Sequence, residues 1–358
     1  TIYKNLSPQI FDVTLYSGKT SKENLNGLSA VSGSDIWAVG NSGKVNHYDG
    51  VSWTEFADLG AENLLCVDMV SASDGWIGAA NGLIYRFNGT SWSQFIDAGS
   101  MSWNTVKMLS SSDGWMAGAD GFVYRFNGSA WSLFADLGNM TWNAIDMLSA
   151  SSGWLADSDG LIYRYDGAAW SSFADTGAMN WYGMSMIAEN DGFVVGNQGK
   201  IYRFNGTAWS ESIDTGLNTW YDAHFPNSGL GYVAGTGGRS AVWNGTAWIL
   251  DGLPILYNVN DIEIIAANNI WAVGDLGSIL HFGGGAGGGG YYPAGVFLSS
   301  VLDTGAAAPL WENLFWTETL PANTDLTIAV RTGNTSSPDG AWSAYSAEFT
   351  NPLAADIS

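Results

Sequence analysis

Short runs of alternating apolar and polar residues follow one another along most of this chain, and the whole pattern recurs every 39 residues. One aromatic position repeats at that spacing, at Trp37, Trp76, Trp115, Trp154, Phe193, Tyr232 and Trp271. Two glycine positions repeat with it, at residues 43, 82, 121, 160, 199, 238 and 277 and at residues 50, 89, 128, 167, 206, 245 and 284. A period of this length predicts an all-β fold, a seven-bladed β-propeller of 39-residue, four-stranded blades.

One repeat, residues 62–99, shows how each blade is expected to fold. Strands are predicted at 64–70, 75–80, 83–87 and 91–96. Asn81-Gly82 and Asn88-Gly89 stand between them, and Asn-Gly favours a tight hairpin in which both turn residues have positive φ. Large aromatic residues recur on the second, third and fourth strands. Because neighbouring blades cover both faces of a propeller sheet, we interpret these rings as packing between blades.

The last repeat lacks a fourth strand, because the tryptophan column of that strand ends early. The column runs through Trp53, Trp92, Trp131, Trp170, Trp209 and Trp248, and its next member would be Gly287. Counting one repeat back from Trp53 gives Thr14, inside an alternating segment at residues 9–17. We predict that residues 9–17 pair with the strand at 278–282 and complete the last blade. Residues 1–282 would then form a closed ring without open sheet edges.

A glycine tract separates the predicted ring from the rest of the chain. Residues 283–290 read GGGAGGGG, and we expect residues 283–295 to be a flexible linker. Residues 296–358 are predicted to form a small β-sandwich-like module, with strands at 296–302, 314–317, 326–331 and 342–349. So few strands leave sheet edges open. The module would be stabilised by docking on the ring or by a strand from another chain, which indicates an assembly.

Charge and composition narrow the possible partners. The chain has 34 acidic and 12 basic residues and a formal net charge of −22, so its surface repels phosphate backbones and we expect no nucleic-acid partner. Only 13% of the residues are charged, which favours an extracellular or cell-surface location. Cys66, the single cysteine, excludes an intrachain disulfide, and its apolar neighbours predict a buried thiol. No run approaches the ~20 apolar residues that cross a bilayer, so we expect no direct membrane span.

The repeats resemble known propeller families. The segments Asp35-Ile36-Trp37-Ala38-Val39-Gly40, Gly43-Lys44-Val45 and Tyr48-Asp49-Gly50-Val51-Ser52-Trp53 are similar to repeats of bacterial cell-surface propellers, tectonin-type lectins and photosystem II assembly factors. They distantly resemble the Asp-box turn of sialidases, and the similarity covers residues 10–282. The tail, with SSVLDTG at 299–305 and VRTGN at 330–334, resembles β-sandwich modules at the ends of exported surface and pilin-like proteins. These resemblances imply a propeller that belongs to a surface structure.

The histidines and arginines do not suggest a catalytic set. His47 and His281 occupy the repeat position that otherwise holds Arg86, Arg125, Arg164 and Arg203, so we interpret it as a half-buried basic position between blades rather than a metal pair. A sialidase needs arginines gathered at the mouth of the channel, whereas these arginines lie at one repeated strand position. We therefore expect no enzymatic activity, no catalytic residues, no metal and no cofactor.

One face of the ring is predicted to bring acidic residues and tryptophans together. Each connection from a fourth strand to the next first strand contains an aspartate, a glycine two residues later and then a tryptophan. The aspartates are Asp97, Asp136, Asp175 and Asp214, and the tryptophans are Trp103, Trp142, Trp181 and Trp220. Indole faces beside carboxylates suit glycans, through stacking and hydrogen bonds. The alternatives are a calcium site built from converging oxygens, or plain turn chemistry with packed indoles.

Several turns also match the acceptor pattern for N-glycosylation, at Asn88, Asn127, Asn205 and Asn244. Turn geometry alone explains asparagine at these positions. They are nevertheless expected to be exposed, and sugars there would shield the outer rim, so we name them as candidate glycosylation sites.

These observations favour a non-catalytic, secreted structural or adhesive protein of the cell surface, and a candidate globular subunit of an extracellular filament or pilus. Its partners would be copies of itself or another surface or pilin-like subunit, joined through strand pairing. The alternative is a glycan-binding lectin that uses the acidic, tryptophan-rich face. A third interpretation, an assembly factor for a membrane complex, rests on the resemblance alone.

Overall fold

The computed structural model describes residues 13–15, 22–253, 255–283, 313–314 and 355–356. The chain divides into two compact units, Thr1–Gly290 and Tyr291–Ser358. In the second unit the described residues are β29 (Asn313–Leu314) and β30 (Ala355–Asp356), which pair antiparallel. The predicted strands at 296–302, 326–331 and 342–349 lie outside the described residues, as do residues 284–295 of the predicted linker. Of the predicted strand at 314–317, Leu314 alone is described.

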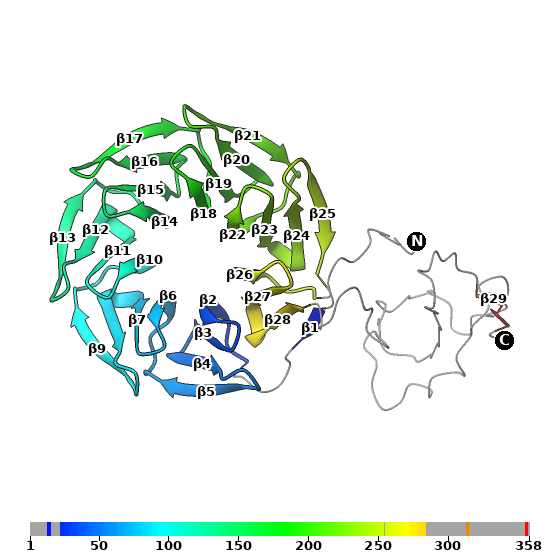
Figure 1. Cartoon of the computed structure of the whole chain (residues 1–358), viewed down its shortest axis with the longest axis horizontal. Coiled ribbons are helices and arrows are strands. Elements are labelled where there is room, and N and C mark those ends of the chain that lie inside the picture. Colours follow the sequence, from blue (N-terminus) through cyan, green and yellow to red (C-terminus); the bar gives the residue numbers. More distant parts are fainter. Residues whose placement is uncertain (1–12, 16–21, 254, 284–312, 315–354, 357–358) are drawn as a thin grey trace. The chain divides into compact units, whose positions relative to one another are not determined.

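The first unit is a ring of seven blades, each a four-stranded antiparallel sheet (Figure 1). The innermost strands are β2 (Leu25–Ser32), β6 (Leu64–Ser71), β10 (Trp103–Ser110), β14 (Trp142–Ser149), β18 (Trp181–Ala188), β22 (Trp220–Asn227) and β26 (Val259–Ala266). The second strands are β3 (Asp35–Gly40), β7 (Asp74–Ala79), β11 (Asp113–Gly118), β15 (Ser152–Asp157), β19 (Asp191–Gly196), β23 (Leu230–Gly235) and β27 (Asn269–Gly274).

The third strands are β4 (Lys44–Tyr48), β8 (Leu83–Phe87), β12 (Phe122–Phe126), β16 (Leu161–Tyr165), β20 (Lys200–Phe204), β24 (Arg239–Trp243) and β28 (Ile279–Gly283). The outermost strands are β5 (Trp53–Asp58), β9 (Trp92–Asp97), β13 (Trp131–Asp136), β17 (Trp170–Asp175), β21 (Trp209–Asp214), β25 (Trp248–Gly252) and β1 (Val13–Leu15). Short 3-10 turns join some second and third strands, η1 (Ala80–Gly82), η2 (Ala119–Gly121), η3 (Thr236–Gly238) and η4 (Asp275–Gly277). Blade 1 consists of β2–β5, and the blades follow in chain order to blade 7.

The ring closes as predicted, through a strand from the N-terminal segment. β1 pairs antiparallel with β28 and completes blade 7 in the order β1-β28-β27-β26 (Figure 1). The register differs from a strict repeat by one residue, because Val13 lies opposite Phe282 where the spacing places Thr14. A one-residue slip exchanges the two faces of a strand. In this register the apolar Val13, and not Thr14, occupies the position equivalent to Trp53. The other residues of the predicted 9–17 segment lie outside the described part of the chain.

One of the two predicted turns has the expected geometry, and the other differs. Asn81 and Gly82 both have positive φ, 59° and 77°, and a Cβ atom on Gly82 would clash with the carbonyl oxygen of Gly99. In the Asn88-Gly89 turn the glycine has positive φ, 88°, and the asparagine does not. The Asn88 side chain instead accepts hydrogen bonds from the backbone N–H groups that follow Gly89, at 2.9 Å each. An Asx turn therefore replaces the predicted hairpin turn.

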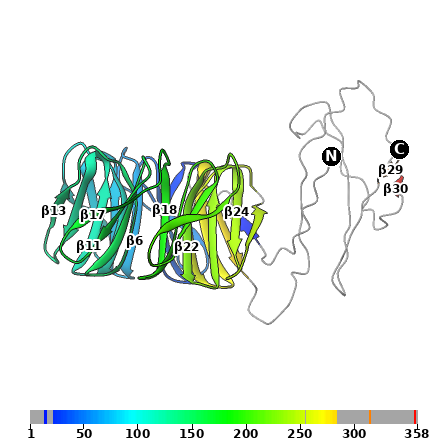
Figure 2. The ribbon, with the colours of Figure 1, turned by 90° about the horizontal axis from the view of Figure 1, so that it is seen from above.

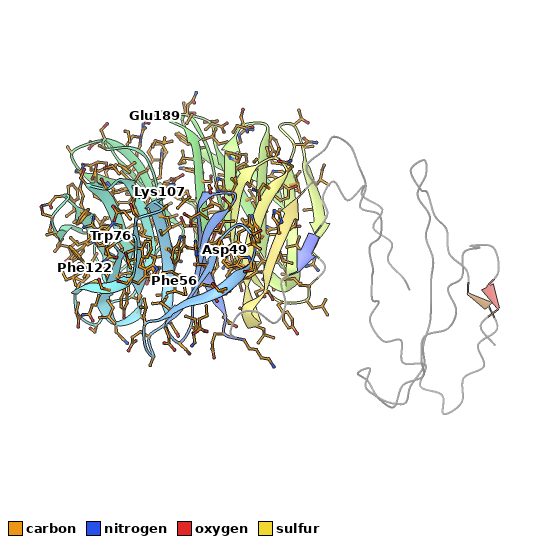
Figure 3. All side chains as sticks on the ribbon, turned by 60° about the horizontal axis from the view of Figure 1, so that its bottom comes forward. Asp49, Phe56, Trp76, Lys107, Phe122 and Glu189 are labelled. Carbon is orange, nitrogen blue, oxygen red and sulfur yellow. The ribbon has the colours of Figure 1, made fainter. Side chains whose placement is uncertain are left out.

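The repeated aromatic residues pack between blades, as predicted. Trp76 of β7 is fully buried, and its ring centre lies 4.7 Å from that of Phe126 and 5.4 Å from that of Trp131, both in the next blade. Arg86 covers the same indole, with its guanidinium carbon 4.9 Å from the ring centre. Figure 3 labels Trp76 within the wall of the ring. Burial of such a ring contributes about 2–3 kcal/mol, so the repeated contact stabilises each interface that contains it.

The outermost strands of blades 1 to 5 each contain a β-bulge, whereas β25 of blade 6 pairs without one. In blade 3 the bulged residue is Phe134, since its neighbours Leu133 and Ala135 pair with Tyr124 and Val123. A bulge twists an edge strand and makes pairing with another chain less favourable. The outer edge of β25 has no such protection.

Candidate functional site

Two sets of loops meet on one face of the ring, as predicted. The turns between second and third strands lie beside the connections that lead into the next blade; Figure 2 shows the ring from the side, with its strands running between the two faces. In blade 2, Gly82 N–H donates to the Met101 carbonyl at 2.5 Å, and Ala98 N–H donates to the Gly82 carbonyl at 3.0 Å. We call this face the acidic face. The turns between third and fourth strands lie on the opposite face.

The four predicted aspartates lie exposed at the ends of the outermost strands on the acidic face. Each carboxylate accepts a hydrogen bond from the N–H of the glycine two residues later, at 2.8–3.0 Å, in the pairs Asp97–Gly99, Asp136–Gly138, Asp175–Gly177 and Asp214–Gly216. This is the turn chemistry named above as an alternative. Asp214 also binds Lys200 at 2.7 Å, and this contact lowers the pKa of the carboxyl group.

The four predicted tryptophans lie beneath these loops and not on the surface. At most 1% of each side chain is exposed, in Trp103, Trp142, Trp181 and Trp220. Trp103 donates its indole N–H to the Gly82 carbonyl at 3.1 Å, and its ring centre lies 4.8 Å from that of Tyr124. The expectation that these rings gather at the mouth of the ring for stacking is therefore corrected. They begin innermost strands, where packing under the turns excludes solvent.

The centre of the ring holds a polar cluster that the repeat pattern did not single out. We call it the axial cluster; its members are on the innermost strands and are Ser29, Asp68, Thr105, Lys107, Asp146, Ser185, Asp222, His224, Asp261 and Glu263. Lys107, labelled in Figure 3, lies 3.3 Å from the Asp146 carboxylate, and His224 lies 3.5 Å from Glu263. The Lys107 side chain is 42% exposed and that of Asp146 13%, so water reaches the cluster unevenly.

These side chains satisfy the free edges of the innermost strands. Each innermost strand pairs on one side, so its other backbone N–H groups need acceptors. Asp146 Oδ2 accepts a hydrogen bond from the Met186 N–H at 2.7 Å, 40 residues later and one blade on. The same offset joins the N–H groups of further residues to acceptors: Met69 to Ser29, Met108 to Asp68, Ile145 to Thr105, Phe225 to Ser185, Ile262 to Asp222, Ile264 to His224 and, across the closure, Leu28 to Asp261.

Blade 3 shows that this requirement is general. Lys107 occupies the position of Asp146 but carries no acceptor. Thr105, two residues earlier on the same strand, makes a different bridge to the next blade by accepting a hydrogen bond from the Ile145 N–H at 3.2 Å. The main role of the axial cluster is therefore to join each blade to the next.

Burial makes the axial cluster sensitive to mildly acidic pH. It raises the pKa of Asp68 to about 6, although Lys107 and the Met108 N–H act in the opposite direction. The carboxyl groups of Asp222 and Asp261 share a hydrogen bond, and burial raises the pKa of both, with the charge of Asp222 adding to the effect on Asp261. These carboxyl groups are therefore more readily protonated in the folded ring than in the unfolded chain.

The pKa of His224 is also raised. Burial lowers it, but the neighbouring Glu263 carboxylate and the charge of Asp222 stabilise the imidazolium and together outweigh burial. A protonated His224 cannot accept the Ile264 N–H through its Nδ1 atom, which lies 3.3 Å away. Its two contacts therefore favour different protonation states.

The repeat position occupied by Asp146 in blade 4 keeps its polar character although its residue type varies. It has no consensus residue type, but it is polar in every blade: Ser29, Asp68, Lys107, Asp146, Ser185, His224 and Glu263. Its neighbours along these strands are mainly apolar. A polar residue kept inside an apolar strand of every repeat indicates a shared hydrogen-bonding role.

The repeated basic position is structural, as predicted. His47 lies 2.8 Å from Asp35 and stacks on Trp37 with ring centres 4.1 Å apart. His281 makes the equivalent contacts, with the Asn269 side chain at 2.9 Å and with an indole in its own blade. The Cys66 thiol is buried, and burial raises its pKa, so the predicted buried thiol is confirmed.

A shallow cavity of about 490 Å³ opens on the outer rim of blade 3. It is lined by Ser112, Asp113, Arg125, Phe126, Asn127, Ser132 and Phe134. Phe134 is 37% exposed, and its ring packs edge-on against Trp115 at 4.7 Å. Arg125 is held by Asp113 at 2.8 Å. The cavity thus combines an exposed aromatic ring with fixed polar groups.

The candidate glycosylation sites Asn88, Asn127, Asn205 and Asn244 lie exposed in turns on the face opposite the acidic face. Each side chain accepts backbone hydrogen bonds within its turn. Glycosylation of these residues stays a prediction.

Within the described part of the chain, no group of three or more His, Cys, Asp or Glu residues is placed to hold a metal ion. Among the same residues, no helix is long and apolar enough to cross a membrane.

Comparison with known proteins identifies the fold and no family. No family model matches the chain, and no curated protein matches its sequence. The ring is similar to YCF48 bound to D1 peptide, with 17% identity over 78% of this chain and 96% of that chain and a TM-score of 0.65. It is also similar to YCF48 from Cyanidioschyzon merolae, with 15% identity over 76% and 98% of the two chains and a TM-score of 0.62. The WD40 propeller domain of Doa1 matches with 12% identity over 75% and 95% and a TM-score of 0.61.

Proposed function

We propose that the ring is a non-catalytic module that binds a partner protein on its outer surfaces. Its fold is that of YCF48 and of WD40 propellers, and one of the similar structures is YCF48 with a D1 peptide bound. At these identities the likeness concerns the fold, so it supports a protein-interaction role by analogy. The partner itself must be argued from the surface of this chain.

The observation that carries the proposal is that the axial cluster joins each blade to the next. Asp68, Asp146, Asp222 and Asp261 each accept a backbone N–H from the neighbouring blade. Carboxylates fixed in this way are positioned to hold the ring together rather than to transfer protons to a substrate. The loops on the two faces and the outer rim then remain as the surfaces for recognition.

We further propose that the module is a secreted structural or adhesive component of the cell surface, the globular subunit of an extracellular filament or pilus. The low content of charged residues and the resemblance of the tail to exported surface modules support this. The outer edge of β25, which pairs without a bulge, offers a place where a strand from another copy or another surface subunit can pair.

Negative-stain microscopy of native material tests the filament proposal. Ordered fibres with a repeating ring would support it, and dispersed rings would contradict it. Leu250→Lys adds a second measurement, because a lysine on β25 opposes edge pairing, and we expect it to prevent fibre formation. Leu133→Lys on the bulged strand β13 is the matched control, since Leu250 and Leu133 are 49% and 50% exposed.

Glycan binding is the second candidate, and the rim cavity favours it. Phe134 offers part of an aromatic face beside Arg125 and Asp113, which suits stacking and hydrogen bonding to a sugar. A glycan array tests this with the wild-type protein and Phe134→Ala. Binding that Phe134→Ala abolishes, with an unchanged melting temperature, would support a lectin; a blank array would contradict it.

A further inference from the structure

Leucines replace small or polar residues at two repeat positions on the acidic face, in consecutive blades. One position, in the connections that follow blades 1 to 4, holds Ala61, Ser100, Asn139 and Ala178, but after blades 5 and 6 it holds Leu217 and Leu256. The other, in the turn between second and third strands, holds Ser42, Asn81, Asp120, Asp159, Gln198 and Gly237 in blades 1 to 6, and Leu276 in blade 7. The fold does not require leucine at either position, because the other blades form the same loops without it.

Each of these leucines is exposed. Leu217 is 100% exposed, Leu256 87% and Leu276 54%, and Tyr257 beside Leu256 is 48% exposed. Exposed apolar side chains gathered on one part of a surface are typical of interaction sites. We call these four residues the apolar patch.

Leu276 is also in an unfavourable backbone conformation. Its φ is 56°, in the left-handed region that disfavours side chains such as leucine. The equivalent residues Ser42, Asn81, Asp120, Gln198 and Gly237 adopt the same region, and asparagine, aspartate and glycine tolerate it better than leucine does. Leucine here therefore lowers stability and exposes apolar surface, which the fold alone does not explain.

Hydrogen bonds place the loops of the apolar patch next to one another. Asn258, which follows Tyr257, accepts the Asp275 N–H through its carbonyl and the Gly237 N–H through its side chain, both at 3.0 Å. The loop of Leu256 and Tyr257 is thus fixed between the turns of blades 6 and 7. The turn of blade 6 is fixed in the same way to the connection of Leu217, since Thr236 N–H donates to the Thr219 carbonyl at 2.9 Å. The central residue of this turn is Gly237, which has no side chain that could separate Leu217 from Leu256.

The rest of the acidic face carries negative charge. In blades 2 to 4, Asp97, Asp136 and Asp175 are exposed and have no ion pair with any described residue. Exposed acidic residues follow in two turns of the same blades, at Asp120 and Asp159. The described basic residues of the face lie in other blades, at Lys22, Lys44, Lys200 and Arg239, and Lys44 and Lys200 each bind two carboxylates. Among the described residues, the face therefore has exposed leucines with Arg239 and the paired Lys200 over blades 5 to 7, and unpaired carboxylates over blades 2 to 4.

We propose that the acidic face binds a protein segment with large apolar side chains at one end and lysine or arginine residues at the other. The apolar end would cover Leu217, Leu256, Tyr257 and Leu276, and the basic end would lie over the carboxylates of blades 2 to 4. This proposal rests on the interaction role proposed above and assigns it a surface and a partner chemistry.

Selection from a random-peptide library tests the proposal. The library is selected on the wild-type ring, and enriched peptides are then measured on a triple variant, Leu217→Ala, Leu256→Ser and Leu276→Asn, in which each residue comes from the equivalent position of another blade. We expect enrichment of peptides that combine Leu, Phe or Trp with Lys or Arg. Their affinity for the triple variant should fall by about tenfold or more, since the buried leucine contacts are lost. The melting temperature of the triple variant should be unchanged or higher, because asparagine tolerates the conformation at 276.

Two further variants separate the contributions. In Asp97→Asn with Asp136→Asn and Asp175→Asn the turn hydrogen bonds can persist while the charge is lost, so binding should weaken and depend less on salt. Leu133→Ser removes a leucine on the rim that is exposed to nearly the same extent as Leu276, 50% against 54%, and this variant should bind as the wild type does. If no peptide is enriched, or if the enriched peptides bind the triple variant equally well, the apolar patch is not the binding site and the proposal is overturned. If the wild type self-associates and the triple variant does not, the apolar patch binds a second copy of this chain, and the proposed partner segment is overturned. The filament test above is independent of these results.

Discussion

Asp68 provides a test of the axial cluster, because burial should make its charge unfavourable in the folded ring. We predict that Asp68→Asn stabilises the protein at about pH 8 and has little effect at about pH 3.5. The variant keeps a side-chain oxygen that can accept the Met108 N–H, which donates to Asp68 at 2.6 Å in the native ring. It removes the charge and preserves the bridge between blades 2 and 3.

The sign follows from the direction of the pKa change. Burial raises the pKa of Asp68 from 3.8 to about 6, so folding favours the protonated form. The stability linked to this group is fully present below about pH 4 and is lost as the pH rises through about 6. A pKa difference of this size corresponds to about 3 kcal/mol, which is an upper value because Lys107 loses a nearby carboxylate in the variant.

Denaturant unfolding at the two pH values, for the wild type and Asp68→Asn, provides the measurement. We expect the variant to exceed the wild type by about 1–3 kcal/mol at the higher pH and to match it at the lower one. Asp136→Asn, which removes an exposed carboxylate, is the matched control. It should leave the free energy of unfolding unchanged at both pH values. A variant that is less stable than the wild type at the higher pH, or a difference that does not change with pH, would refute the argument.

Three further predictions concern the ring itself. Deleting residues 1–18 removes β1 and exposes β28, so the whole ring should melt at a lower temperature in calorimetry, and an unchanged transition would contradict closure by β1. Ser185→Ala removes the acceptor of the Phe225 N–H at 3.0 Å and should cost about 1 kcal/mol in denaturant unfolding. Gly121→Ala places a Cβ against the Gly138 carbonyl and should cost more than Gly138→Ala, which meets open space at a similarly positive φ; equal losses would exclude the clash.

The architecture could be predicted from the sequence because one environment repeats. Each blade buries the same aromatic column, so the spacing from Trp37 to Trp271 defines both the strands and the number of blades. The closing strand was predictable from what the last repeat lacks. Its register was not, since the repeat count places Thr14 opposite Phe282, whereas the pairing puts the apolar Val13 there.

The candidate site was harder to predict, because its decisive contacts join different blades. Tryptophan near an aspartate suggested an open surface, but the start of an innermost strand lies under the turns, where Trp103 and its equivalents fill the interior. The axial hydrogen bonds have an offset of 40 residues, one more than the repeat, so they cross from one blade to the next. A pattern read within one repeat does not contain that partner.

Seven nearly equivalent blades make it possible to separate what the fold needs from what it tolerates. In blade 3 Lys107 cannot accept a backbone hydrogen bond as Asp146 does in blade 4, and Thr105 makes a different bridge to the next blade through the Ile145 N–H. A departure that is compensated nearby indicates a structural requirement. Leu276 has no such compensation in its turn, because its side chain is exposed and its backbone conformation is unfavourable. Asparagine, aspartate and glycine tolerate this conformation better than leucine in three of the equivalent turns, and a bound partner that covers the exposed Leu276 side chain is the physical explanation we favour.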